Sequence, residues 1–156
     1  MDMRSFQVAV AFIAIIAFTI CPVMGENYFY VKDMNMRLDE GNATFEVNYT
    51  LEMFTKFYVI ALGCKYIEPD LLSFLGHFNN LTTIRADPDS ASLIASGAGE
   101  YNSGYYLFES RPLGAKVDKL TVVYPEGRPK TFYNMTSTPN VFCVAKVPPN
   151  QSGFYS

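Results

Sequence analysis

The sequence predicts a mainly β domain of the α+β class, built from antiparallel, sandwich-like sheets of about seven short strands with one or two short helices. Three observations predict it. Several stretches alternate apolar and polar residues with a period of two, which is typical of half-buried strands. Clusters of Gly, Pro, Asn and Asp separate these stretches at close intervals. Only the region after the second stretch departs from this period, and the helices are expected there.

The first two alternating stretches predict an antiparallel hairpin. Tyr28–Leu38 alternates with one interruption at Lys32, which lies on the same parity as Tyr30 and Met34. Ala43–Met53 alternates without interruption, and the turn-forming residues 39–42 separate the two stretches. Two strands of this kind joined by a tight turn form a hairpin with one face in the core.

The next region predicts the helices, at about 54–63 and 69–76. Residues 54–63 are almost wholly apolar and end at Gly63, which suits a helix C-terminus. Periodicity does not separate a buried helix from a buried strand there, and the β-branched and aromatic content favours a strand. We interpret the segment as a short buried helix. Residues 68–76 carry Pro69 with acidic neighbours at the start and Gly76 at the end, which is typical of a second helix.

Short strands and turns fill the second half of the chain. A polar loop rich in Ser, Gly and Asp spans 86–104 and includes one weak strand at 91–96. Turns are predicted at 111–114 and 124–127, where Pro and Gly occupy turn positions. The remaining strands are predicted at 79–85, 105–110, 117–124, 130–136 and 140–147.

The N-terminal residues 1–25 predict an export signal peptide. Arg4 supplies a charged start, an apolar stretch follows, and the small residue Gly25 stands at the boundary with Glu26. The alternative is an uncleaved membrane anchor, because residues 6–24 approach the length of about 20 that a spanning helix needs. Residues 26–156 then form a single extracellular domain with a frayed tail at 148–156, and we expect a secreted or cell-surface location.

The cysteine count agrees with export. Of three cysteines, removal of residues 1–25 eliminates Cys21 and leaves Cys64 and Cys143. An even pair in an oxidising compartment is a disulfide candidate. The alternative is two separate buried thiols, since free cysteine is common in protein cores.

Glycosylation sequons are the second feature typical of an exported chain. Five Asn-x-Ser/Thr triplets occur after residue 25, which makes their asparagines candidate glycan acceptors. They are Asn42, Asn48, Asn80, Asn134 and Asn150. Asn48 lies on the polar parity of its predicted strand, where a bulky glycan has the exposure it requires.

Nothing in the sequence predicts catalysis, a cofactor or a nucleic-acid partner. Residues 26–156 contain 11 Lys and Arg against 14 Asp and Glu without a basic cluster, which argues against nucleic acid. His77 is the only histidine, and neither the spacing of a zinc site nor a nucleophile motif accompanies it. We therefore expect no enzyme activity and no metal or other cofactor.

Residues 100–108 are the most suggestive surface. Tyr, Ser, Gly and Asn occur together there, as they do in adaptable binding surfaces, with Tyr101, Tyr105 and Tyr106 as candidate contacts. The alternative is a strand whose aromatic side chains pair across the sheet and enter the core.

The segments around Leu113-Gly114, Val117 and Leu120–Gly127, together with Thr138–Phe142, resemble small exported proteins of uncharacterised function from methane-producing archaea. The resemblance covers mainly residues 105–145 and carries no known catalytic residues. It implies a cell-envelope or extracellular setting. The sequence thus predicts a glycosylated structural or interaction protein whose partners are cell-surface proteins or glycans, or alternatively a module that binds carbohydrate or a small ligand through residues 101–108. Membrane contact is expected only through an uncleaved N-terminal segment.

Overall fold

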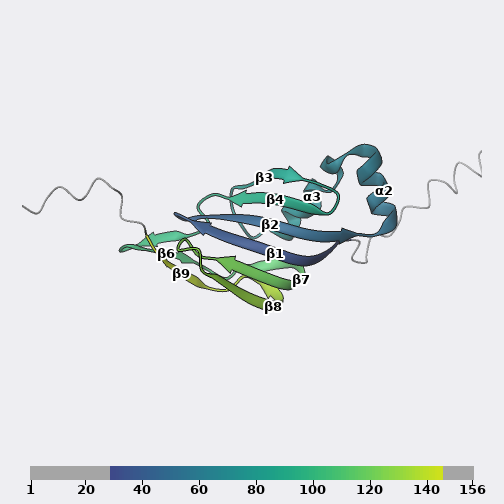
Figure 1. Cartoon of the computed structure of the whole chain (residues 1–156). Coiled ribbons are helices and arrows are strands. Elements are labelled where there is room, and N and C mark those ends of the chain that lie inside the picture. The colour runs from purple at the N-terminus through teal and green to yellow at the C-terminus, as the bar shows by residue number, and fades with distance from the viewer. Residues whose placement is uncertain (1–28, 146–156) are drawn as a thin grey trace, which may run out of the picture.

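In the computed structural model, residues 29–145 are described, and they form a mainly β fold with short helices (Figure 1). The strands are β1 Phe29–Asp39, β2 Asn42–Leu51, β3 Leu81–Ala86, β4 Ser90–Ala95, β5 Glu100–Asn102, β6 Tyr105–Phe108, β7 Pro112–Val123, β8 Pro129–Ser137 and β9 Val141–Val144. The helices are α2 Met53–Leu62, the 3₁₀ helix η1 Cys64–Tyr66 and α3 Glu68–Phe74. The predicted fold class is confirmed. The predicted export signal and frayed tail lie outside the described residues.

Two sheets make up the domain. The larger has six strands in the order β3-β4-β2-β1-β7-β8, and the smaller has three in the order β5-β6-β9. The pairs are antiparallel except for β1 and β7, which are parallel neighbours in the six-stranded sheet. The smaller sheet lies at one end of the larger sheet and α2 at the other (Figure 1).

The predicted first hairpin is present. β1 and β2 pair from Phe29 opposite Leu51 to Asp39 opposite Asn42. Glu40 and Gly41 connect them with φ of 42° and 82°. Positive φ at both central residues defines the two-residue turn whose twist matches that of antiparallel strands. The hairpin therefore places the start of β1 beside the residues that lead into α2.

A bulge at Lys32 shifts the register of β1 against β2, and at the same level three neighbouring strands change which side chains face the core. In the pairing of these strands, Lys32 in β1, Asp118 in β7 and Asn134 in β8 have no directly opposite Cα partner. An extra residue reverses the alternation of a strand, so Val31 and Met34 both point inward. The expectation that Tyr30 shares the face of Met34 is wrong for this reason. Tyr30 is exposed, and its hydroxyl donates a hydrogen bond to the Asp118 carboxylate.

One face of the six-stranded sheet forms the core. Its alternate residues pack against α3, the loop after α3 and the inner face of the three-stranded sheet. The largest fully buried side chains are Phe45, Phe108, Met34, Met36, Leu38, Ile67, Leu71, Leu75, Leu93, Leu120, Val31 and Val47. Gly114 of β7 lets α3 approach closely, because a Cβ there would lie 2.9 Å from the Cα of Phe74. On the opposite face of this sheet, most side chains are polar and are exposed or half-buried.

The three-stranded sheet is fixed to the larger one through two glycines. The amide of Gly99 donates a hydrogen bond of 2.8 Å to the carbonyl of Gly41 in the first turn. A Cβ on Gly99 would lie 2.7 Å from the ring of Phe108, and one on Gly41 would lie 3.0 Å from the ring of Tyr106. Both rings therefore pack directly against glycine backbone atoms, and these contacts hold the three-stranded sheet in place.

The helix predicted at 54–63 is present as α2, but the expectation that it is buried is wrong. Only Thr55 and Val59, four residues apart, are buried. Side chains four apart lie on one narrow stripe of a helix, and the rest of α2 is exposed. The helix ends at Gly63, whose φ of 89° and ψ of 164° belong to glycine.

Other boundaries differ from the expectations. β7 begins at Pro112, so the segment predicted as a turn at 111–114 mostly belongs to a strand. The weak strand predicted at 91–96 is present as β4, and the predicted loop at 86–104 also contains the short strand β5. Within residues 29–145, no helix is long and apolar enough to cross a membrane.

Candidate interaction surface

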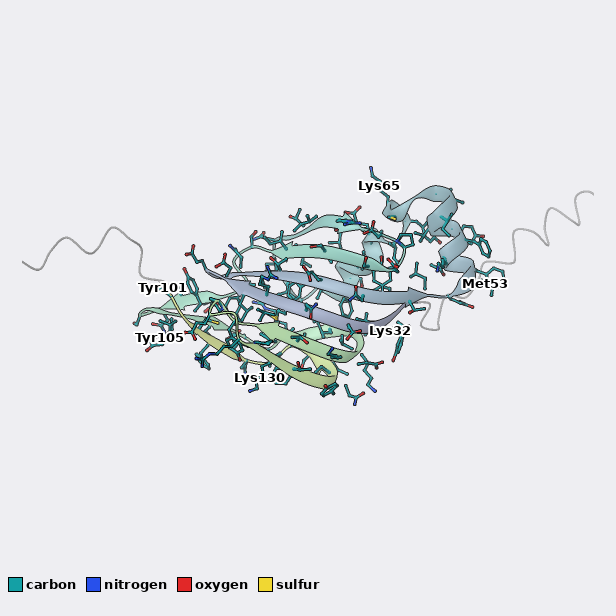
Figure 2. The ribbon with its side chains drawn as sticks, viewed as in Figure 1. Lys32, Met53, Lys65, Tyr101, Tyr105 and Lys130 are labelled. Atoms are coloured by element: carbon teal, nitrogen blue, oxygen red, sulfur yellow. The ribbon has the colours of Figure 1, made fainter. Side chains whose placement is uncertain are left out.

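The β5–β6 hairpin forms the tip of the molecule opposite α2 (Figure 2). Ser103 and Gly104 connect the strands with φ of 48° and 92°, again a two-residue turn. Asn102 consequently pairs with Tyr105, and Tyr101 with Tyr106. The Ser, Gly and Asn residues that predicted an adaptable binding surface thus lie in a defined hairpin, as in the alternative prediction of a strand with cross-strand aromatic pairs.

The three tyrosines of the predicted ligand surface lie on two faces of this hairpin. Tyr101 and Tyr106 face each other across the strands, with ring centroids 5.4 Å apart at 62°. Tyr106 continues toward the core, whereas Tyr105 lies on the opposite face because neighbouring strand residues alternate. The structure therefore joins Tyr101 with Tyr106 as a cross-strand aromatic pair and separates both from Tyr105.

Tyr105 belongs to a second group of exposed apolar side chains. It pairs with Val144 of β9, and Leu107 pairs with Phe142. Tyr105, Phe142 and Val144 are 53%, 67% and 61% exposed. In β5, Asn102 pairs with Tyr105 and Glu100 pairs with Leu107, so each cross-strand pair continues into a row of three residues. We call this face the outer platform; it consists of Glu100, Asn102, Tyr105, Leu107, Phe142 and Val144.

Sequence reasoning missed the two platform residues from β9. The alternation there assigns Val141 and Cys143 to the inner face, and both are buried. The same alternation places Phe142 and Val144 on the outer face, where apolar residues are unexpected on a solvated strand. The sequence carried one signal for these two residues, because apolar side chains occupy both alternating sets of positions in this short strand.

An apolar groove of about 260 Å³ runs between β9 and the turn after β7. Tyr124 and Pro125 line one side, and Phe142 and Val144 line the other. Cys143 also borders it, and burial, followed by the charge of Glu126, raises the pKa of its thiol. A thiol held protonated is a poor nucleophile.

The predicted disulfide partners are separate in the structure. Cys143 is buried in β9, whereas Cys64 is half-buried in η1 directly after α2. Both are free thiols. β9 lies at the opposite end of the domain from α2, which η1 directly follows (Figure 1).

Of the candidate glycan acceptors, Asn48, Asn80 and Asn134 are exposed. Asn48 lies on the solvent face of β2, and Asn134 lies in β8 with φ of 56°. Asn42 is half-buried, and its Oδ1 accepts a hydrogen bond of 3.0 Å from the amide of Gly97. Asn150 lies outside the described residues. The exposed three have the accessibility that glycosylation requires.

His77 has surroundings typical of a structural residue. It is exposed, and its carbonyl accepts a hydrogen bond of 2.7 Å from Nη1 of Arg111. The same guanidinium lies 5.4 Å from the centre of the Phe78 ring, so Arg111 fixes this loop to the start of β7. Across 29–145, no three His, Cys, Asp or Glu side chains are grouped so that they could hold a metal ion.

Comparison with known proteins gives no match to a family model, to a curated protein or to a solved structure. The resemblance of residues 105–145 to exported archaeal proteins stays a prediction. Any functional conclusion therefore depends on the chemistry of the surfaces described above.

Proposed function

We propose that this chain is an exported, glycosylated, non-enzymatic interaction protein of the cell surface, and that the outer platform is its contact surface. The observation that carries the proposal is the array of Tyr105, Phe142 and Val144, each more than half exposed on adjacent strands. Exposed aromatic residues grouped on one face are typical of interaction sites.

The backbone beneath the platform supports this proposal. Phe108 and Cys143, on the inner face of the same strands, are buried in the common core. The two-residue turn fixes the register of β5 and β6, so the outer side chains have a defined spacing. Because these side chains already have a defined position before binding, the surface loses less conformational entropy when a partner docks. The adjacent apolar groove extends the contact area along β9.

A second candidate function is carbohydrate binding through the same face. Tyr105 is flanked in its row by the amide of Asn102, and Glu100 occupies the neighbouring row. An aromatic ring next to amide and carboxylate groups suits a sugar, which presents an apolar ring face and hydroxyl groups.

The test compares two matched variants of the exported protein. We expect fluorescently labelled protein to bind the surface of the cells that produce it, and the pair Tyr105→Ala and Phe142→Ala to abolish this binding. Tyr133→Ala is the control, because Tyr133 is equally exposed but lies on β8 of the other sheet. Equal loss in both variants, or retained binding in the platform variant, contradicts the proposal.

A glycan array distinguishes the two candidates. Binding of defined glycans that depends on Tyr105 favours the carbohydrate module, whereas cell binding that survives glycosidase treatment of the cells but not protease treatment favours a protein partner.

Export and glycosylation are tested by intact mass. We expect the natively exported protein to begin at Glu26 and to carry added sugar mass, and Asn48→Gln to remove one sugar increment. A chain that begins at Met1 without sugar would contradict this part of the proposal.

A further inference from the structure

Helix α2 exposes an unusual amount of apolar surface. Met53, Phe54 and Phe57 are 69%, 71% and 64% exposed, and Ile60 and Leu62 are 64% and 67% exposed. Tyr58 and Tyr66 stack beside them with ring centroids 5.9 Å apart. A soluble helix normally hides such residues and exposes charges. Its apolar face has no partner among the described residues.

The helical geometry makes this surface continuous. Successive residues are rotated by about 100° around a helix with 3.6 residues per turn. The buried stripe of Thr55 and Val59 therefore lies opposite Phe57. Around Phe57, an arc of more than half the circumference contains no charged side chain. The only charge on α2 is Lys56, at the border of the buried stripe.

The position of α2 indicates what covers it. Phe29 pairs with Leu51, and α2 begins two residues later at Met53, so the chain that precedes β1 leaves the domain beside α2. The apolar stretch of residues 6–24 ends only five residues before Phe29. Five residues span at most about 18 Å. If this stretch is inserted in a bilayer, α2 lies at the surface of that bilayer.

We propose that, in the chain that still carries residues 6–24, before cleavage ahead of Glu26, α2 is an interfacial membrane helix, which lies in the plane of the bilayer with its Phe57-centred face among the upper acyl chains. Its ten residues are too few to cross a membrane, and a short helix with a broad apolar face is suited to the interface. This proposal does not depend on a ligand at the outer platform, which lies at the other end of the molecule (Figure 2).

The residues at the border of the apolar face fit the same environment. Tyr58 and Tyr66 combine an apolar ring with a polar hydroxyl, as aromatic residues at membrane surfaces do. Lys56 and Lys65 are exposed and have long side chains that reach the headgroups. Glu52 and Glu68 at the two ends of the segment balance these charges. We therefore expect α2 to bind bilayers whose lipids carry no net charge.

The absence of tryptophan from the sequence makes a direct test simple. Phe57→Trp places a single fluorophore at the centre of the proposed membrane face, and Tyr105→Trp places one at the opposite end as the control. Both side chains are exposed, so neither variant disturbs the core. We expect full-chain protein in phosphatidylcholine vesicles with brominated acyl chains to show quenching severalfold stronger for the F57W fluorophore than for the Y105W fluorophore.

Three outcomes overturn the proposal. Equal, weak quenching of both fluorophores means that α2 stays in water. A blue-shifted but unquenched F57W signal that depends on protein concentration means that α2 binds a second copy of the chain. The same signal without concentration dependence means that residues 6–24 of the same chain cover it.

A second variant controls for quenching that arises from another part of the chain. Phe54→Glu with Ile60→Glu, added to F57W, places two carboxylates on the apolar arc. Both positions are exposed, so the circular dichroism spectrum should not change. We expect the quenching to be lost, and quenching that persists contradicts the assignment of the contact to α2.

Discussion

The two ends of this domain both expose apolar side chains, but they differ in how those side chains are held. At one end, Tyr105 and Phe142 stand on paired strands whose inner residues are part of the core. At the other end, only Thr55 and Val59 of α2 are buried. A preorganised array suits a partner of defined shape. A helix with apolar residues over most of its circumference suits a fluid surface such as a lipid bilayer. Similar composition thus supports different kinds of contact.

This contrast predicts that the two ends differ most in how they tolerate truncation beneath the exposed residues. Phe108 is 2% exposed and joins the three-stranded sheet to Gly99. We expect Phe108→Ala to reduce the free energy of unfolding by about 3–5 kcal/mol, because it removes a buried ring and leaves a cavity. Urea denaturation measures the loss. Phe142→Ala, on the exposed face of the same sheet, should change stability by less than about 0.5 kcal/mol. Similar losses in both variants would mean that the outer platform is structural.

The connection after α2 is the next most sensitive position. Gly63 has a φ of 89° and a ψ of 164°, and a Cβ there would meet no atom within 4 Å. Gly63→Ala therefore isolates backbone strain, which we expect to cost about 1–3 kcal/mol because this region of φ and ψ is accessible almost only to glycine.

Gly104→Ala is the matched variant at the other end. Its φ is 92° and it also has open space, but it lies in a hairpin turn, where a side chain costs about 1–2 kcal/mol. Thermal unfolding compares the two. A smaller loss for Gly63→Ala than for Gly104→Ala would mean that α2 rearranges freely.

Sequence patterns predicted the fold well where one physical rule acted alone. The alternation of β2 and the turn residues before it determined the first hairpin, because burying one face of a strand fixes its register. The alternation of β1 failed at Lys32, where β1 has a bulge against β2, and the distant strand β7 changes its core-facing side chains at the same level. A local pattern contains no information about a distant partner strand.

The candidate surfaces were harder to predict for a related reason. The tyrosines of residues 101–106 were found, but Phe142 joins Tyr105 only because β9 pairs with β6. α2 was correctly predicted as a helix, yet its apolar composition was interpreted as burial, because a core helix and a membrane-surface helix share that composition. The small contact stripe of Thr55 and Val59 became apparent only with the tertiary structure.

The attachment of α2 is tested by shortening its buried stripe. Val59 is 1% exposed. Val59→Ala removes two carbon atoms from the contact, and we expect a loss of about 1.6 kcal/mol at about 0.8 kcal/mol per methylene group. Ile60→Ala is the control, because Ile60 is adjacent but 64% exposed, and it should leave stability in solution nearly unchanged. Equal losses in the two variants would show that the outer face of α2 packs against protein.

The two ends also differ in the pH at which each loses stability. Burial, followed by the charge of Glu126, raises the pKa of the Cys143 thiol beneath the outer platform. Near α2, burial, followed by the charges of Cys64, Asp87 and Asp89, raises the pKa of Tyr49. The hydroxyl of Tyr49 also donates a hydrogen bond of 2.5 Å to the carbonyl of Asp87.

In each case the folded state keeps its proton after the unfolded chain has lost it, so stability falls as pH rises. The contribution of Cys143 is complete below about pH 8.5 and that of Tyr49 below about pH 10, where the unfolded side chains begin to ionise. We expect Cys143→Ala to flatten the first part of the decline and Tyr49→Phe to flatten the second, in urea denaturation at successive pH values. A decline above pH 8.5 that is unchanged in Cys143→Ala would mean that the thiol beneath the outer platform is accessible to water, and the platform would then be less rigidly supported than the geometry of β6 and β9 implies.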